Sequence, residues 1–208
     1  HPSIQSDCIK NYIKIDKNII ITGPNASGKT TLIKATLLNI LLVQQTGFGF
    51  FDTGKIKPID NLYCYLNIPD TNSRDSLFQA EARRCVNILN KIDQKIKETH
   101  FCIFDELFSG TNPYEAISSA YSYLKHISKN NNVKFLLTTH FNKLCEMLDK
   151  NDSFINMKMD CEIKNDKPNY LYKIDNGISY IKGGVCVLKQ LEFPDNIIKE
   201  TKKIIKKL

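Results

Sequence analysis

Residues 23–30 carry the clearest chemical pattern in the chain. They read Gly-Pro-Asn-Ala-Ser-Gly-Lys-Thr and match G-x-x-x-x-G-K-[ST] at every fixed position. In loops of this kind, backbone N–H groups surround a phosphate, the lysine reaches the β- and γ-phosphates, and the final hydroxyl binds Mg²⁺. We therefore predict a phosphate-binding loop with Lys29 on the phosphates and Thr30 on the metal. The predicted nucleotide-binding residues are Gly23, Pro24, Asn25, Ala26, Ser27, Gly28, Lys29, Thr30 and Thr31.

Two neighbouring carboxylates follow an apolar run at residues 101–104. A strand that ends in Asp105 and Glu106 is what a phosphate-loop ATPase needs opposite its loop. Side chains adjacent along a strand point in different directions, so the two can serve different partners. We predict that Asp105 holds Mg²⁺ and that Glu106 orients and activates the attacking water. Alone, the pair could be a strand that runs into a polar turn, but beside the loop it indicates ATP hydrolysis.

Thr139 and His140 follow another apolar run, residues 133–138. Both are thereby placed at the carboxyl end of a predicted strand, which is the edge where open α/β sheets bind ligands. By residue type alone, a histidine at this place is more often structural or exposed. Its position one strand after Asp105 and Glu106 favours a catalytic role. We predict that His140 donates to the γ-phosphate or to the attacking water.

The elements that must position these residues alternate between strands and helices. A β-branched run at residues 18–22 predicts a buried strand before the loop, and residues 31–45 predict a helix after it. We expect an α/β fold with a mixed or parallel central sheet flanked by helices, and antiparallel strands late in the chain. Further strands are predicted at 9–15, beside the loop-bearing strand, and at 62–68, with helices at 76–98, 115–129 and 185–191 and a hairpin of 154–163 and 169–174.

The helix predicted at residues 76–98 has one apolar face and a polar start. Asp75 or Ser76 can cap its first turn. A capped helix start can receive an anion, although a cap without a ligand is the simpler explanation. The apolar residues recur at three- and four-residue steps and are Phe78, Ala82, Cys85, Val86, Leu89, Ile92 and Ile96.

Composition restricts the class of protein. At 208 residues the chain is long enough for one α/β domain, and no apolar run approaches the roughly 20 residues of a membrane span. Nothing resembles a signal peptide. Seven cysteines, an odd number without a C-x-x-C pair, indicate free thiols and an intracellular protein of the cytoplasm or nucleus rather than a secreted one. The net charge of +7 is compatible with a nucleic-acid partner, but a solvated surface is the simpler explanation.

For two segments the sequence is compatible with more than one location in the protein. Residues 46–60 are rich in glycine and phenylalanine and are predicted to be a loop near the nucleotide or at a subunit boundary. Contact with bases is the alternative, but no basic residues are interleaved there. The C-terminal helix, residues 197–208, has isoleucines on one face and lysines on the other. We expect it to pack on its own domain, with DNA, a membrane surface or a partner as alternatives.

Taken together, these motifs resemble the ATPase domain of the MutS family of DNA mismatch-repair proteins. Residues 20–31 resemble the family's phosphate loop, 76–81 its signature, 105–112 its Asp-Glu strand end with a Gly-Thr turn, and 139–141 its Thr-His-aromatic segment. Residues 1–2 also resemble the family's lead-in, and residues 177–179 and 183–184 resemble its closing segments. The resemblance covers nearly the whole chain. Because the sequence begins without methionine, we expect a single domain, residues 1–208, from the C-terminal part of a longer protein.

This resemblance implies an ABC-type P-loop ATPase that uses ATP and Mg²⁺ and works as a dimer. It implies a homodimer or a MutS-like heterodimer in which Ser76 of one subunit faces the nucleotide of the other. Residues 72–76 and 109–112 would then lie at the dimer boundary. It further implies that ATP controls clamping on DNA, in mismatch repair or related DNA maintenance, with most DNA contacts outside this chain.

The chain also differs from the family's usual pattern. Ala26 and Ala82 replace methionines, residues 112–116 depart from the usual small hydroxyl residues and Asp-Gly, and Cys8-Ile9 stands where an aromatic often lies under the adenine. These differences indicate a divergent branch. Two alternatives to a MutS-like ATPase are a nucleotide-gated dimerisation module with little turnover and an ATPase of another chromosome-maintenance family. The latter would normally carry Leu-Ser-Gly-Gly, which this chain lacks.

Overall fold

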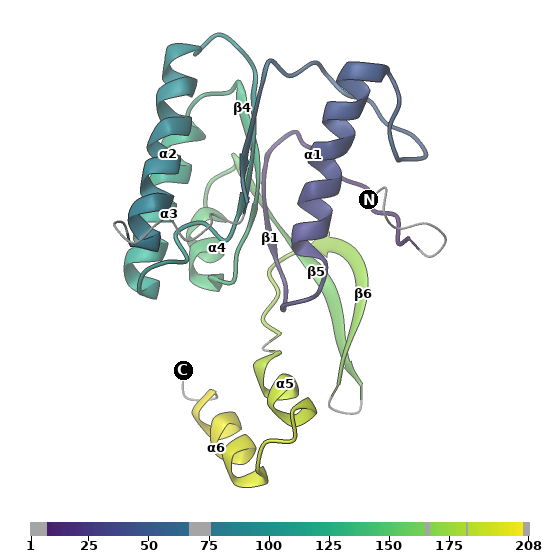
Figure 1. Ribbon diagram of the computed structural model, residues 1–208, viewed down its shortest axis with the longest axis vertical. Helices are drawn as coiled ribbons and strands as arrows, with labels where there is room; N and C mark the ends of the chain where they lie inside the picture. The colour runs from purple at the N-terminus through teal and green to yellow at the C-terminus, as the bar shows by residue number, and fades with distance from the viewer. Residues whose placement is uncertain (1–7, 67–75, 165–166, 182, 206–208) are drawn as a thin grey trace.

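The chain forms a mixed sheet with helices on both faces (Figure 1). The computed structural model describes residues 8–66, 76–164, 167–181 and 183–205. In these ranges the elements are β1 (Asn18–Thr22), α1 (Lys29–Thr46), β2 (Asn61–Tyr65), α2 (Leu77–Gln94), β3 (His100–Asp105), α3 (Pro113–Ile127), β4 (Val133–Thr138), α4 (Asn142–Leu148), β5 (Phe154–Lys164), β6 (Lys167–Asn176), α5 (Gly184–Gln190) and α6 (Asp195–Ile205).

The strand order is β2-β3-β4-β1-β5-β6. All neighbouring strands are parallel except β5 and β6, which form an antiparallel pair. The predicted α/β class, the mixed sheet and the late antiparallel strands are therefore confirmed. Strands β1, β3 and β4 read as continuous apolar runs because both of their faces are covered.

Two hydrophobic cores lie on the two faces of the sheet. Helix α1 packs on one face through Ile33 and Ile40, while α2, α3 and α4 pack together on the other (Figure 1). The start of α2 is fixed by hydrogen bonds of its cap. The Ser76 hydroxyl accepts from the Gln79 N–H at 3.3 Å, and the Gln79 side chain accepts from the Ser76 N–H at 2.9 Å, which completes a capping box. The predicted cap at Ser76 is thus confirmed, whereas Asp75 lies outside the described residues.

The strand predicted at residues 9–15 is absent, because that segment has no regular structure. Both edges of β1, where we expect it to pair, are occupied by β4 and β5. The segment instead lies along β6, where the Asn11 side chain bonds two backbone groups. Its amide donates to the Tyr172 carbonyl at 2.9 Å, and its oxygen accepts from the Ile174 N–H at 2.8 Å. The Asn11 side chain thus makes the hydrogen bonds to β6 that backbone groups would make in a strand pair.

Several helix predictions need correction. Helix α2 ends at Gln94 rather than residue 98, and Val86 and Ile96 of its predicted apolar face are exposed, while Ile88 is buried. Helix α4 has no counterpart among the predicted helices, because seven residues are too few to show a clear period. None of the helices in the described ranges is long and apolar enough to cross a bilayer.

The phenylalanine-rich segment and the C-terminal helix lie away from the phosphate loop. The exposed phenylalanines Phe48, Phe50 and Phe51 follow the C-terminal end of α1, whereas the loop precedes its N-terminal end. The segment is a loop, as predicted, but it lies at the far end of α1 from the phosphate loop rather than beside it. Its alternative place, at a subunit boundary, stays a prediction. Helix α6 packs mainly against α5, and both extend away from the sheet (Figure 1). The expectation that this helix packs on its own domain is met through α5 rather than through the sheet, and residues 206–208 lie outside the described ranges.

All seven cysteines lie within the described residues, and none forms a disulfide, as predicted. Cys85, Cys102, Cys145 and Cys186 are buried. Burial in apolar surroundings raises the pKa of Cys85 and of Cys145 to about 12. These thiols act as core side chains rather than as reactive groups.

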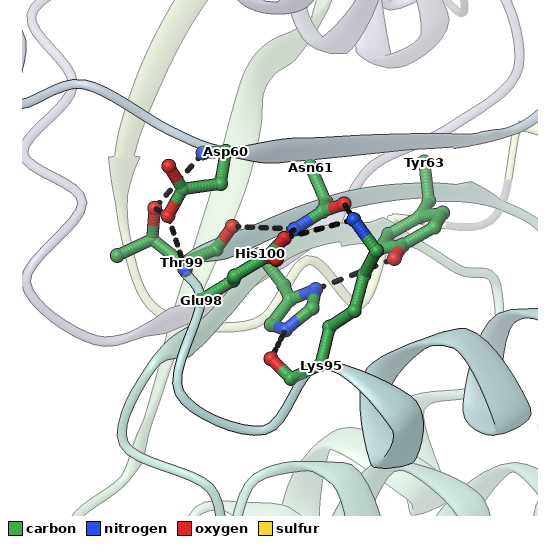
Figure 2. A network of polar contacts seen from close by, with 7 residues as sticks. All are labelled: Asp60, Asn61, Tyr63, Lys95, Glu98, Thr99 and His100. Atoms are coloured by element: carbon green, nitrogen blue, oxygen red, sulfur yellow. Dashed lines mark hydrogen bonds and ion pairs between the residues drawn. The ribbon is translucent and has the colours of Figure 1, made fainter.

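A polar network joins β2, β3 and the end of α2 at the amino ends of the strands (Figure 2). Figure 2 shows His100 between Tyr63 and the Lys95 carbonyl. The His100 Nε2 lies 3.0 Å from that carbonyl, and its Nδ1 lies 3.3 Å from the Tyr63 hydroxyl. A carbonyl can only accept, so Nε2 donates and Nδ1 accepts. His100 is therefore a satisfied structural histidine at the opposite end of β3 from Asp105.

We predict that His100→Ala lowers the free energy of unfolding by about 1–3 kcal/mol, because it leaves the Lys95 carbonyl and the Tyr63 hydroxyl without their partner. Urea denaturation measures this change. The matched control is His126→Ala, which removes an exposed histidine. Equal stabilities of His100→Ala and wild type would show that the network contributes nothing.

Candidate functional site

The parallel sheet brings the predicted site residues to one edge. Asp105 on β3 pairs with Thr138 on β4, and Thr138 pairs with Ile21 on β1. The predicted phosphate loop continues from β1, and His140 follows β4. Because parallel strands end at the same edge, residues from three distant parts of the sequence meet there.

The predicted phosphate loop turns sharply before α1 begins. Gly28 has φ 94° and Ala26 φ 63°, so two residues occupy the left-handed region that lets successive N–H groups face inward. The Lys29 ammonium donates to the carbonyls of Gly23 at 2.9 Å and Pro24 at 3.1 Å. Lys29 is 5% exposed, and burial lowers its pKa, an effect that the charges of Glu106 and Asp105 oppose.

Two hydroxyl groups converge on the carboxylate of Asp105. The Thr30 hydroxyl donates to its two oxygens at 2.9 and 3.2 Å, and the Thr138 hydroxyl donates to the same carboxylate. The two predicted metal ligands, Thr30 and Asp105, therefore lie in contact. Within the described part of the chain, no group of three or more His, Cys, Asp or Glu residues could hold a metal. A hydroxyl and one carboxylate suit Mg²⁺ that takes further ligands from water and substrate phosphates.

Glu106 faces His140, away from the hydroxyl groups that bind Asp105. Its Oε1 lies 2.8 Å from the His140 Nε2, and both side chains are half-exposed. The hydrogen bond from His140 holds the pKa of Glu106 below its usual value despite partial burial. Glu106 has φ 54°, and its N–H donates to the Thr138 carbonyl at 3.1 Å. The two predicted catalytic residues thus form one pair at the open edge of the site.

A cavity of about 310 Å³ opens beside this pair. The cavity extends from the predicted metal ligands, Thr30 and Asp105, to the start of α2. Its walls are formed by Thr30, Tyr65, Leu77, Glu81, Asp105, Glu106 and Ser109. Ser76, the predicted signature residue, caps α2 and is exposed. Of the predicted dimer boundary at residues 72–76, only Ser76 lies inside the described ranges.

Sequence reasoning missed Tyr172 at this edge, and it noted Glu81 only as part of the signature at residues 76–81, without its contacts. The ring of Tyr172 on β6 lies against the loop, since a Cβ added to Gly28 would lie 3.1 Å from its Cδ1. Tyr172 is 46% exposed, so part of its ring faces solvent. Glu81 on α2 is buried and accepts bonds from Ser109 and Gly110. The alternation of β6 and the spacing along α2 give no signal for either contact, because both partners are distant in sequence.

The closing segment after β6 also lies against the loop. The Ser179 N–H donates to the Thr22 hydroxyl at 2.8 Å, directly before the loop begins. A Cβ added to Gly183 would lie 3.4 Å from the Pro24 Cβ. The segments at residues 177–179 and 183–184, noted in the sequence, therefore support the end of β1 and the loop.

Comparison with known proteins identifies the family of this chain. The family model described as MutS domain V matches residues 19–208. The chain is 32% identical to the DNA mismatch repair protein MutS of Finegoldia magna over 98% of this chain and 24% of that protein. It is 31% identical to the protein of the same name from Fusobacterium nucleatum, over 100% of this chain and 24% of that protein. The chain thus spans about a quarter of the length of these curated relatives. The chain belongs to the MutS family and corresponds to its domain V.

Proposed function

We propose that this chain is an Mg²⁺-dependent ATPase domain of ABC-type P-loop architecture, from a protein that acts in DNA mismatch repair. The observation that carries the proposal is the contact between Thr30 and Asp105 beside the Glu106–His140 pair. A phosphate loop, a metal-binding carboxylate and a carboxylate that orients water are the parts that phosphoryl transfer to water requires. The names of the relatives, DNA mismatch repair protein MutS, supply the biological setting.

The residues at the edge fit ATP and Mg²⁺. The Ser27 hydroxyl in the loop is buried and finds no hydrogen-bond partner among the residues that the structure describes. The Lys29 ammonium is buried, and its two partners are neutral carbonyls of the loop itself. Thr30 and Asp105 would hold Mg²⁺, which when bound neutralises developing charge on the phosphates.

In this mechanism each side chain of the site has a separate role. Lys29 and the loop N–H groups bind the triphosphate, with the positive end of α1 behind them. Glu106 accepts a hydrogen bond from the attacking water and takes its proton as the water oxygen bonds to the γ-phosphorus and the bond from that phosphorus to the bridging oxygen of ADP breaks. His140 holds Glu106 in its ionised form and can donate to the γ-phosphate.

The open side of the site supports a composite arrangement. Glu106 and His140 are half-exposed in the single chain, so water reaches them freely. A second chain that covered them with the start of its α2 would exclude bulk water and add the Ser76 hydroxyl and a helix N-terminus near the γ-phosphate. We therefore propose a homodimer or MutS-like heterodimer whose ATP-dependent closure clamps DNA through other regions of the protein.

We predict that Glu106→Gln lowers the rate of ATP hydrolysis by about 10² to 10⁴, because the variant cannot take a proton from the water. ATP binding should persist, since Gln leaves the loop and Asp105 intact. Phosphate release and equilibrium binding of ATP measure the two effects. Normal turnover by Glu106→Gln would exclude the proposed mechanism. Tight binding with no turnover in the wild type would instead identify a nucleotide-gated module.

A second prediction concerns the binding of the adenine base of ATP. The exposed Tyr172 ring beside Gly28 offers a face on which a purine can stack. Tyr172→Ala should weaken ATP binding by roughly 1–3 kcal/mol, the usual value of base–aromatic stacking. Binding of inorganic triphosphate should stay unchanged. Tyr114→Ala, which removes an exposed tyrosine on α3, is the control. Equal loss of affinity for both ligands would mean that Tyr172 supports the loop rather than the base.

A third prediction concerns protonation. His140→Ala should raise the pKa of Glu106 toward the ordinary carboxyl value, because the hydrogen bond that favours its ionised form is lost. Carbon-13 NMR titration of the glutamate carboxyl groups in metal-free protein measures this change. Glu98, whose pKa is held low mainly by the Asn61 amide, should titrate as in the wild type. An unchanged Glu106 titration would show that the pair does not form in solution.

A further inference from the structure

Helix α2 carries a buried carboxylate that the proposed reaction does not use. Glu81 is 2% exposed, and a carboxylate in such a place is unfavourable unless hydrogen bonds compensate for lost hydration. Its Oε1 accepts from the Ser109 N–H at 3.1 Å and from the Ser109 hydroxyl at 3.0 Å. Its Oε2 accepts from the Gly110 N–H at 3.1 Å. One side chain of α2 therefore holds two successive residues of the turn that follows Glu106.

Close packing joins the same turn to the start of α2. A Cβ added to Gly110 would lie 2.7 Å from the Leu77 Cγ and 2.8 Å from the Phe78 backbone N, so no side chain fits there. The Phe78 and Phe108 rings also pack together, with centroids 5.6 Å apart. The turn after β3 and the first turns of α2 thus form one packed unit, with the Glu81 bonds inside it.

The backbone that carries Glu106 needs such support. Glu106 has φ 54° and Phe108 has φ 59°, conformations that residues with a Cβ adopt only where the surroundings impose them. On the upstream side, the Glu106 N–H is fixed to the Thr138 carbonyl at 3.1 Å. On the downstream side, the Glu81 bonds fix Ser109 and Gly110. The direction of the Glu106 carboxylate therefore depends on contacts at both ends.

We propose that Glu81 is a positioning residue for ATP hydrolysis. By holding Ser109 and Gly110 against α2, it keeps the Glu106 carboxylate directed at His140 and at the attacking water. The same contacts fix Glu106 relative to Ser76, at the start of α2, so displacement of that helix start would move the turn that carries Glu106. This proposal rests on the proposed ATPase function and assigns to Glu81 no contact with substrate.

The test compares Glu81→Gln with wild type. Gln keeps the size of the side chain but replaces one acceptor oxygen by a donor that faces N–H groups. We expect kcat to fall about 10- to 100-fold, the usual effect of losing a hydrogen bond to a charged group. The Kd of a non-hydrolysable ATP analogue should stay within about twofold, since the loop is untouched. The control is Glu98→Gln, a half-exposed carboxylate at the other end of the strands. A wild-type kcat for Glu81→Gln would overturn the proposal.

A milder variant keeps the test valid if Glu81→Gln folds poorly. Ser109→Ala removes one donor and leaves the buried carboxylate its two N–H partners. It should lower kcat by about threefold to tenfold, with Ser118→Ala on the exposed face of α3 as the matched control. An unchanged kcat for Ser109→Ala, with the wild-type fold shown by circular dichroism, would also overturn the proposal.

Combination with Glu106→Gln separates positioning from a general structural role. If Glu81 acts through the Glu106 carboxylate, adding Glu81→Gln to Glu106→Gln should lower the residual single-turnover rate no further. An equal loss in both backgrounds would show that Glu81 acts elsewhere. Failure of the proposed function would look different, because Glu106→Gln would then hydrolyse ATP at the wild-type rate.

Discussion

The common register of three parallel strands is the constraint on which the site depends. Asp105, Thr138 and Ile21 lie side by side only because β3, β4 and β1 pair in this alignment. A shift of one residue in β3 would turn the Asp105 side chain to the other face of the sheet and break its contact with Thr30. Apolar residues on both faces of these strands fix the register, so the core and the site are set by the same pairing.

The second requirement is that an unfavourable backbone be held at Glu106. The strand ladder ends at Asp105, and the chain leaves it through residues in the left-handed region. This change of direction separates the two neighbouring carboxylates, so that Asp105 meets Thr30 while Glu106 meets His140. Contacts from β4 on one side and from α2 on the other stabilise the conformation. Division of roles between adjacent residues therefore depends on tertiary contacts beyond the strand itself.

Sequence patterns predict the features that arise from short segments. The glycine loop, the apolar strands that precede Asp105 and His140, and the cap at Ser76 each depend on residues close together in the chain. Their order in the sequence also predicts the parallel sheet, because strands and helices alternate. The amino-acid sequence alone is therefore enough to place Thr30, Asp105, Glu106 and His140 at one edge of the sheet.

Features created by distant contacts could not be predicted in this way. The segment at residues 9–15 alternates like a strand, yet β4 and β5 already occupy the edges of β1, and Asn11 bonds to β6 instead. Tyr172 approaches Gly28 only because β6 folds back beside the loop. The most direct test of the whole account is the rate of phosphate release per chain, measured with ATP and Mg²⁺ over a range of chain concentrations. If a second chain completes the site, this rate rises with concentration and levels off as dimers form. A rate per chain independent of concentration, or no release from dimers seen by light scattering, would contradict the account.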